Sequence, residues 1–525
     1  MRLVTMAGDE SSYDVIGFGD ELPGILALIC AAREYRRRTL KYPRVLLMSK
    51  GSKQEGVGGH LVRGGLAYLD RSQISRDLQI ALNLEPFGAP PAIYKEFLQR
   101  AGVAYIGLDP RKADAALRKM MQEAGVALIR EIEIESVLKE GQRIIGIKPT
   151  KGGPFLGKQF IDSTVNAELA QAAGVGKLKG FETFGLPESE LPVTLVFETE
   201  GISDRRLKEL EYNYLKRFTN PADAQAQNYL QHAAGFDSKL AERLRKDMVD
   251  SYGNLKTLWA GSDHIDIRAS ALSVAYHSFR GKKLSLYESG AILDRANIAI
   301  LPDGRLSWNA LLCSVNGTEA EELARRGAKP TPKMLQEMAF VEKWMKSIGA
   351  TSVKPASELY IRHAGNITGV VQPLTGASML MGGVPPHEAL GTFAYHFDVR
   401  GGIPGIGEKA KAQGFTSVSF DLPIFNIGIQ HTLIKDVPNL AVVSPASGFK
   451  GFAPAAGRII EFNAAVGQGL GIASIIALLS GRNLTNVSNM EVKNVLIETG
   501  QTPRIFGFAK VAEASKLEQF ESLVA

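Results

Sequence analysis

Cysteine is almost absent from this chain of 525 residues: only Cys30 and Cys313 occur, far apart in the sequence. Neither has a histidine partner at the spacing of a zinc site, and two distant thiols cannot form a disulfide framework. The sequence therefore predicts no metal centre. It also predicts a protein of a reducing compartment, for which we expect the cytoplasm.

Long apolar runs are also missing. The most apolar late stretch, residues 467–479, is too short and too rich in glycine to span a bilayer, so we expect a buried helix there and no transmembrane segment. Asp9 and Glu10 stand near the N-terminus, where a signal peptide needs an apolar segment, and we expect no signal peptide.

A large excess of one charge is absent as well. The net charge is +6, and the basic surplus is spread along the chain apart from a cluster at Arg36, Arg37 and Arg38. This cluster stands at the end of an expected helix, where cations complement the helix dipole. We therefore expect no nucleic-acid partner.

The chain does contain a β-α-β pattern close to its N-terminus. Apolar periodicity predicts a strand over 13–18, a helix over 25–38 and a second strand over 44–48. Parallel strands with both faces covered are almost continuously apolar, as these two are. The pattern favours an α/β fold with a parallel sheet.

A glycine-rich turn joins the first strand to the helix. Gly19 and Gly24 take the first and last positions of a G-x-G-x-x-G fingerprint, in which a helix N-terminus meets a dinucleotide pyrophosphate. Glu21 takes the middle position, where glycine lets the backbone approach the phosphates. A carboxylate there would repel them unless it turns away. A frame that starts at Gly17 instead loses the last glycine, so we prefer the first frame.

The pattern of apolar and charged residues changes along the chain. Residues 1–180 read as a nucleotide-binding domain, and residues 181–420 as an inserted α+β substrate or cap domain with charged amphipathic helices. Residues 421–525 return to short apolar strands and a long apolar helix. We expect a discontinuous Rossmann-like domain, with helices on both faces of a mixed or parallel sheet, interrupted by the second domain.

The chain resembles the FAD-dependent oxidoreductases whose Rossmann domain carries a large insertion. Five stretches in order carry the resemblance: the turn at 14–24; Gly56-Val57-Gly58-Gly59-His60 with Gly64-Gly65; Phe160-Ile161-Asp162-Ser163-Thr164 with Glu168-Leu169-Ala170; Tyr360-Ile361-Arg362-His363 with Tyr395-His396-Phe397-Asp398; and Asn439-Leu440-Ala441-Val442-Val443 with Arg458 and Gly467-Gln468. The third is the most specific. Together they span nearly the whole chain.

The departures from this family fall at nucleotide and substrate positions. Besides Glu21, Ser49 and Lys50 replace the acidic residue expected at the end of the second strand, where it binds ribose hydroxyls. Pro445 stands where the family has arginine, and His363 where it has glutamate. Packing positions survive, which fits either a divergent flavoenzyme or a related fold that has lost its flavin.

The resemblance implies a set of FAD contacts along the crevice. These are Gly19, Glu21, Pro23, Gly24, Ser49, Lys50, Gly58, Gly59, His60, Ile132, Ser163, Thr164, Arg458, Gly467 and Gln468. Some have a structural alternative: Ser163 and Thr164 can cap the helix that follows, and Gly467 can permit close helix packing. Ile132 would contact adenine through its backbone.

Four residues of the expected second domain are candidates for the substrate side: Arg362, His363, His396 and Asp398. Arginine can clamp a carboxylate, and histidine can move a proton near neutral pH. A structural ion pair between Arg362 and Asp398 is the alternative.

The sequence thus favours an FAD-dependent oxidoreductase acting on a small organic substrate by hydride or electron transfer. A non-catalytic homologue with weakened FAD binding, acting as a binding or scaffold module, is the rival hypothesis. An NAD(P)-dependent enzyme is less favoured, because no second fingerprint is obvious.

Overall fold

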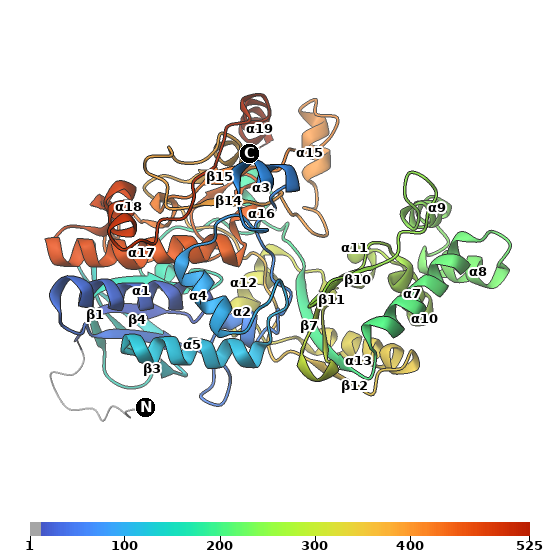
Figure 1. Ribbon diagram of the computed structural model, residues 1–525, viewed down its shortest axis with the longest axis horizontal. Helices are drawn as coiled ribbons and strands as arrows, with labels where there is room; N and C mark the ends of the chain where they lie inside the picture. The colour runs from blue at the N-terminus through green and yellow to red at the C-terminus, as the bar shows by residue number, and fades with distance from the viewer. Residues whose placement is uncertain (1–11, 525) are drawn as a thin grey trace.

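A computed structural model describes residues 12–524 of the chain, which form two sheet-containing lobes (Figure 1). Asp9 and Glu10, on which the signal-peptide expectation rests, lie outside the described residues. The larger lobe is built on a seven-stranded sheet and the smaller on a six-stranded sheet.

The larger sheet has the order β3-β2-β1-β6-β5-β4, with β16 paired to β6. Its strands are β1 (Ser12–Phe18), β2 (Val45–Ser49), β3 (Val126–Arg130), β4 (Ile134–Glu140), β5 (Arg143–Pro149), β6 (Phe155–Asp162) and β16 (Leu440–Val442). The pairs β1–β2, β1–β6, β2–β3 and β16–β6 are parallel, whereas β4–β5 and β5–β6 are antiparallel. The expected mixed Rossmann-like α/β sheet is confirmed.

Both faces of this sheet are covered, because neighbouring residues of one strand point to opposite sides. Val15 and Leu47 belong to the core shared with the long helices, whereas Ile16 and Leu46 belong to a second core on the other face. The helices of this lobe are α1 (Leu22–Thr39), α2 (Gly59–Val62), α3 (Arg76–Leu82), α4 (Ala92–Arg100), α5 (Pro110–Ala124), α6 (Glu168–Ala172), α16 (Ala453–Gly457), α17 (Ile460–Ser480), α18 (Asn489–Glu498) and α19 (Val511–Val524).

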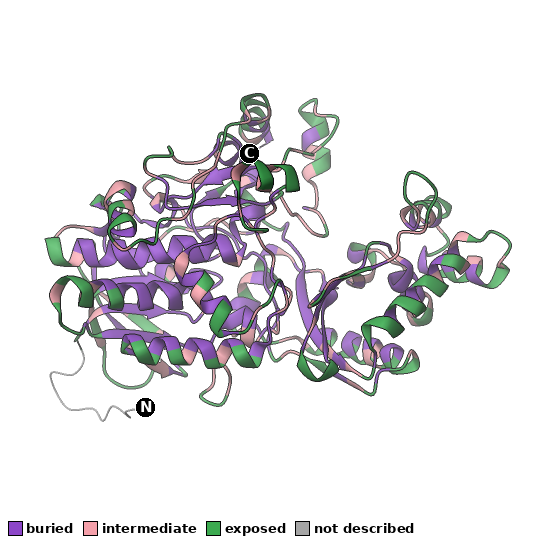
Figure 2. Cartoon of the chain, in the orientation of Figure 1, coloured by how far each residue is buried: buried purple, intermediate pink, exposed green. Residues whose placement is uncertain are grey.

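Helix α1 follows from its sequence: Pro23 lies in its first turn, Arg36, Arg37 and Arg38 in its last, and Leu40 closes it in the left-handed conformation. It packs along α17, and both helices are buried over most of their length (Figure 2). Among residues 12–524, α17 is the one helix long and apolar enough to cross a membrane, with a mean hydropathy of 1.7, and 89% of that window is buried inside the protein.

The smaller sheet is antiparallel and has the order β12-β7-β11-β10-β9-β8. Its strands are β7 (Val193–Glu200), β8 (Trp259–Ala260), β9 (His264–Asp266), β10 (Ala291–Ile300), β11 (Leu306–Cys313) and β12 (Ser352–Pro355). The helices of this part of the chain are α7 (Asp204–Thr219), α8 (Ala224–Ala233), α9 (Ser238–Asp247), α10 (Ala271–Arg280), α11 (Leu286–Ser289), α12 (Gly317–Arg325) and α13 (Pro332–Ser347). All of it lies within the range 181–420 expected for the insertion.

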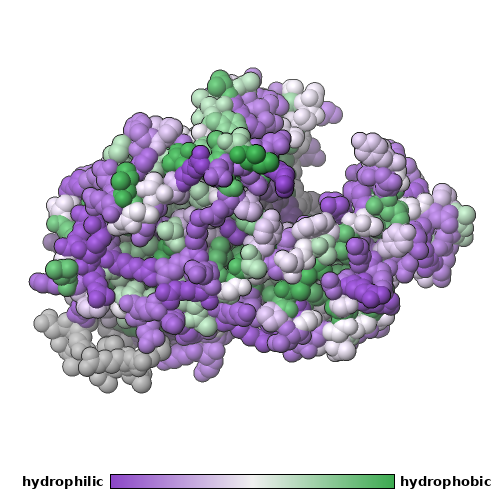
Figure 3. Space-filling view, in the orientation of Figure 1, coloured by the Kyte–Doolittle hydropathy of each residue, from purple (hydrophilic) through white to green (hydrophobic). Residues whose placement is uncertain are grey.

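The last part of that range packs with the C-terminal segment instead. Two short strand pairs and a helix contact make this connection: β13 (Leu374–Thr375) with β17 (Phe449–Lys450), β14 (Thr392–Ala394) with β15 (Ile424–Asn426), and α14 (Gly376–Leu380) with α19. Helix α15 (Ile406–Ala412) stands on the same side of the molecule. Figure 3 shows the surface hollowed between this side and the tip of the smaller lobe.

Candidate functional site

A cavity of about 380 Å³ opens where β1, β2, β3 and β6 end. In an open α/β sheet, ligands bind in the crevice outside the carboxyl ends of the strands. Six of the expected cofactor residues line it: Gly19, Glu21, Lys50, His60, Ser163 and Thr164. The crevice is rich in acid, because Asp20, Glu55, Glu131, Glu133, Glu168 and Glu358 also line it.

The glycine turn fits tightly against the end of β6. Gly19 has a φ of +92°, and an added Cβ would lie 2.6 Å from the backbone nitrogen of Thr164. A Cβ on Gly24 would overlap the Ser163 side chain, whose hydroxyl donates a 2.6 Å hydrogen bond to the Gly19 carbonyl. Glycine is therefore required at both positions by close approach, as the fingerprint predicts. Ser163 thus fixes the turn.

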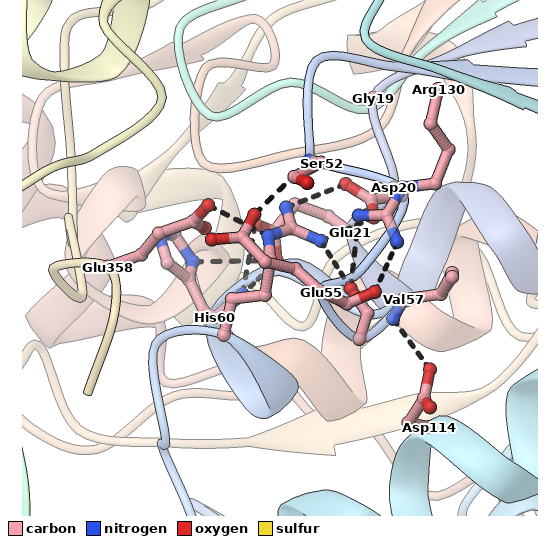
Figure 4. Close-up of polar contacts among 12 residues, drawn as sticks. Gly19, Asp20, Glu21, Ser52, Glu55, Val57, His60, Asp114, Arg130 and Glu358 are labelled. Atoms are coloured by element: carbon pink, nitrogen blue, oxygen red, sulfur yellow. Dashed lines mark hydrogen bonds and ion pairs between the residues drawn. The ribbon is translucent and has the colours of Figure 1, made fainter.

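Glu21 is the N-terminal capping residue of α1, and its side chain reaches the Gly58–Gly59–His60 loop. Both carboxylate oxygens lie 3.2 Å from the backbone nitrogen of His60, which donates to them. A Cβ on Gly59 would overlap the Glu21 carboxylate, so this glycine makes room for it. Figure 4 shows Glu21 and His60 at the centre of this network.

Asp20 and Arg63 form a buried pair beside Glu21. The Arg63 guanidinium donates to the two Asp20 oxygens at 2.5 and 2.9 Å and to Glu358 at 2.8 Å, while Arg130 lies 3.7 Å from Asp20. Burial alone would raise the pKa of Asp20, but Arg63 outweighs it and the pKa lies below its usual value. The Arg63 guanidinium is therefore already engaged by two carboxylates of the protein.

The pKa values of Glu21 and His60 shift in opposite directions. Burial, reinforced by the Asp20 carboxylate, raises the pKa of Glu21 to about 8. Burial and the Arg63 charge lower the pKa of His60 to about 3. His60 is thus neutral at physiological pH and supplies no balancing charge, although its Nδ1 lies 3.5 Å from Glu21.

The end of β2 carries the residues expected near a ribose. The Ser49 hydroxyl is buried and finds no hydrogen-bond partner among residues 12–524. The Lys50 ammonium lies 2.7 Å from Glu168 and 3.2 Å from Glu133. The Ile132 N–H donates to the Ser49 carbonyl at 3.0 Å, which leaves this backbone nitrogen engaged within the protein.

A second polar group forms around Arg458, which directly follows α16. Its guanidinium donates to the Tyr360 hydroxyl at 2.7 Å and to Asp398 at 2.5 Å. His396 Nε2 lies 4.0 Å from Asp398, and half of the His396 side chain is exposed. The Arg362 guanidinium lies over the Tyr360 ring at 4.6 Å and is buried. Arg362 and Asp398 make no direct ion pair among the salt bridges of residues 12–524; Asp398 pairs with Arg458.

His363 is separated from solvent and engaged at both ring nitrogens. Its Nδ1 lies 2.8 Å from Glu190, and its Nε2 lies 2.8 Å from the Asn366 side-chain oxygen. Its side chain is fully buried. The structure therefore holds His363 within an internal network.

Gly467 and Gln468 lie inside α17 and do not line the crevice. A Cβ on Gly467 would overlap the Pro23 carbonyl in α1, so this glycine permits close helix packing. The Gln468 amide donates to Gln501 at 2.8 Å. Gly58 has a φ of +129°, and it forms the loop that carries His60.

Several residues of the site are not indicated by the sequence patterns. Asp20 stands within the glycine turn and Arg63 directly before Gly64, so their positions beside these glycines are a signal in the sequence. Glu358 offered no such signal, since it lies 295 residues from the Arg63 side chain that it contacts. Tyr360 was recognised as part of a motif but not as the partner of Arg458.

Comparisons with known proteins give one family and several remote structural likenesses. The family model described as FAD dependent oxidoreductase matches residues 14–496, and a search of curated proteins finds no match. Solved structures with remote similarity include L-proline dehydrogenase from P. horikoshii (10% identity, 94% of this chain and 99% of that chain, TM-score 0.33). Halogenase PltM is another (10% identity, 90% of this chain and 71% of that chain, TM-score 0.37). Likenesses this remote assign no substrate. With the family model spanning nearly its whole length, the chain belongs to the family of FAD-dependent oxidoreductases.

Proposed function

We propose that this protein transfers a hydride or electrons between a small organic molecule and bound FAD. The observation that carries the proposal is the glycine turn at Gly19 and Gly24, which opens onto a cavity at the carboxyl ends of parallel strands. Membership of the family supplies the cofactor class.

The residues of the crevice fit FAD in two respects. Gly19 and Gly24 let the turn pack closely against the end of β6, so that the backbone at Gly19 borders the crevice where a pyrophosphate would approach. At the end of β2, Lys50 lines the crevice, and the adjacent Ser49 hydroxyl is buried without a partner, which is costly for a polar group. Glu21 is the exception, because its carboxylate stands beside the expected phosphate position.

FAD, when bound, would supply the two-electron redox chemistry. Among the protein's own residues, His396 is the group that we propose takes up a proton from the substrate. The Gln73 side-chain oxygen accepts from its backbone N–H and lies 2.9 Å from Nδ1, which assigns the ring proton to Nδ1 and leaves Nε2 free as the base. Asp398 would stabilise the imidazolium that forms, and Arg458 orients Asp398.

The first test is the visible absorption spectrum of the purified, desalted protein and of its acid-released supernatant. Flavin bands that are released intact would support the proposal and would show that the flavin is bound non-covalently. A colourless protein that also fails to take up added FAD would contradict it. That outcome would favour the second candidate, a non-catalytic homologue acting as a binding module.

A specific observation favours this second candidate: Glu21 already occupies the His60 amide, and Arg63 is already paired with Asp20 and Glu358. As for location, we propose the cytoplasm or another reducing compartment. Both cysteines, Cys30 and Cys313, are free and buried, which is compatible with such a compartment.

A further inference from the structure

The Glu21 carboxylate sits in the crevice as an anion would. It accepts from the His60 N–H through both oxygens, at 3.2 Å each, and it fills the space that Gly59 leaves open. It stands at the middle position of the fingerprint, which exists so that the backbone can approach the phosphates. A side-chain carboxyl group of the protein thus accepts the hydrogen bond of a loop amide at the middle position of the fingerprint.

The charges around Glu21 are balanced without it. The cations Arg63, Arg130 and Lys329 face three carboxylates, those of Asp20, Glu55 and Glu358. His60 is the other titratable group against Glu21, and it is neutral near physiological pH. An ionised Glu21 is therefore an uncompensated buried charge, which is costly.

We propose that the Glu21 carboxyl occupies the phosphate-binding loop in the unloaded protein, and that the dinucleotide binds only when this carboxyl is neutral or displaced. The inference rests on the proposed function, because it takes FAD as the incoming dinucleotide. FAD loading is then linked to the protonation of Glu21, whereas a fingerprint with glycine at this position has no group to protonate.

The sign of the pH dependence follows from the direction of the shift. With the pKa of Glu21 raised to about 8, the carboxyl is already neutral below that pH and FAD affinity is constant there. A bound diphosphate raises the pKa further, since like charges disfavour ionisation. Above about pH 8, binding must therefore take up a proton, and the dissociation constant rises about tenfold per pH unit.

The experiment titrates flavin-free protein with FAD, followed by quenching of flavin fluorescence, between pH 6 and pH 9.5. The proteins are the wild type, Glu21→Gln, Glu21→Gly and the control Glu135→Gln, which removes an exposed carboxylate on β4. We expect the wild type and Glu135→Gln to weaken about tenfold per unit above pH 8. Glu21→Gln and Glu21→Gly should show flat profiles, and Glu21→Gly should bind FAD more tightly at every pH.

The outcomes separate this inference from the proposed function. Binding with the same pH profile in the wild type and Glu21→Gln would overturn the inference and leave the proposed function standing. Failure of every protein to bind FAD at any pH would overturn both.

A second measurement needs no FAD: urea unfolding of the flavin-free wild type and Glu21→Gln. A carboxyl whose folded pKa lies above its unfolded value of 4.5 stabilises the fold at low pH and loses that contribution as pH rises toward 8. The variant should therefore gain stability relative to the wild type across that range. Equal pH dependence in both proteins would show that Glu21 is not an uncompensated charge.

Discussion

The two parts of helix α1 differ in what they contact. At its N-terminal end, the turn through Gly19 and Glu21 borders a cavity lined with charged groups, and Glu21 carries an unbalanced carboxyl. Along its body, α1 packs against α17, where Gly467 and Gly471 bring the two backbones close together. Glycine allows close packing in both parts. At the turn, Gly19 and Gly24 make room for the end of β6 and so set the backbone against the cavity, whereas in α17 Gly467 and Gly471 make room for α1 alone.

This comparison shows that the role of a glycine depends on which atoms the fold places opposite it. A tightly packed apolar contact stabilises the fold and tolerates little change. A charged, hydrogen-bonded crevice with residues of shifted pKa is where binding sites are found. The following substitutions test this division.

Gly471→Leu should have the largest effect on stability. A Cβ at this position would overlap the Ala27 carbonyl, and backbone atoms cannot move aside cheaply. We expect a loss of about 3 kcal/mol in the free energy of unfolding, measured by urea denaturation. The control is Gly407→Leu in α15, where a Cβ meets nothing within 4 Å; a similar loss there would contradict the packing argument.

Gly24→Asp should affect binding more than folding. The new side chain would displace Ser163, which fixes the turn that borders the crevice, and it adds a negative charge to that turn, which disfavours a diphosphate nearby. We expect FAD affinity to fall about a hundredfold, which corresponds to about 2.7 kcal/mol. Fluorescence titration measures the affinity, and circular dichroism checks that the protein stays folded. Retained flavin in this variant would show that the crevice is not the cofactor site.

Ser163→Ala should have the smallest effect. It removes the hydrogen bond to the Gly19 carbonyl and leaves that buried acceptor unpaired, which costs about 1 kcal/mol of stability. Thermal unfolding measures the change. Ser480→Ala is the matched control, since its hydroxyl bonds to the Ile476 carbonyl within one helix near its end. An equal loss of stability in both variants would show that the hydrogen bond to the Gly19 carbonyl contributes no more than a bond within a helix.

Local patterns were enough to predict the Rossmann-like unit. The expected strand over 13–18, helix over 25–38 and strand over 44–48 correspond to β1, α1 and β2 within a few residues at each end. Apolar periodicity and turn glycines are properties of short segments, so they can be read without knowing the rest of the chain. The buried helix expected at 467–479 lies within α17 for the same reason.

The candidate site was only partly predictable. Six expected residues line the crevice: five lie at strand ends or in the glycine turn, and the sixth, His60, lies in α2. The pairing of Arg63 with Glu358, and of Arg458 with Tyr360, joins segments separated by 295 and 98 residues. No local pattern encodes contacts at such separations.

The sequence by itself determined the fold family, the position of the phosphate-approach turn and the unusual carboxyl within it, since each is a matter of residue type at a fixed local spacing. Only the tertiary structure decided what each of these residues meets. It directed Glu21 onto the His60 amide, set Gly467 against α1 and enclosed His363 between Glu190 and Asn366. The physical reason is that hydrogen bonds, charge balance and steric overlap depend on distances between atoms, which folding alone establishes.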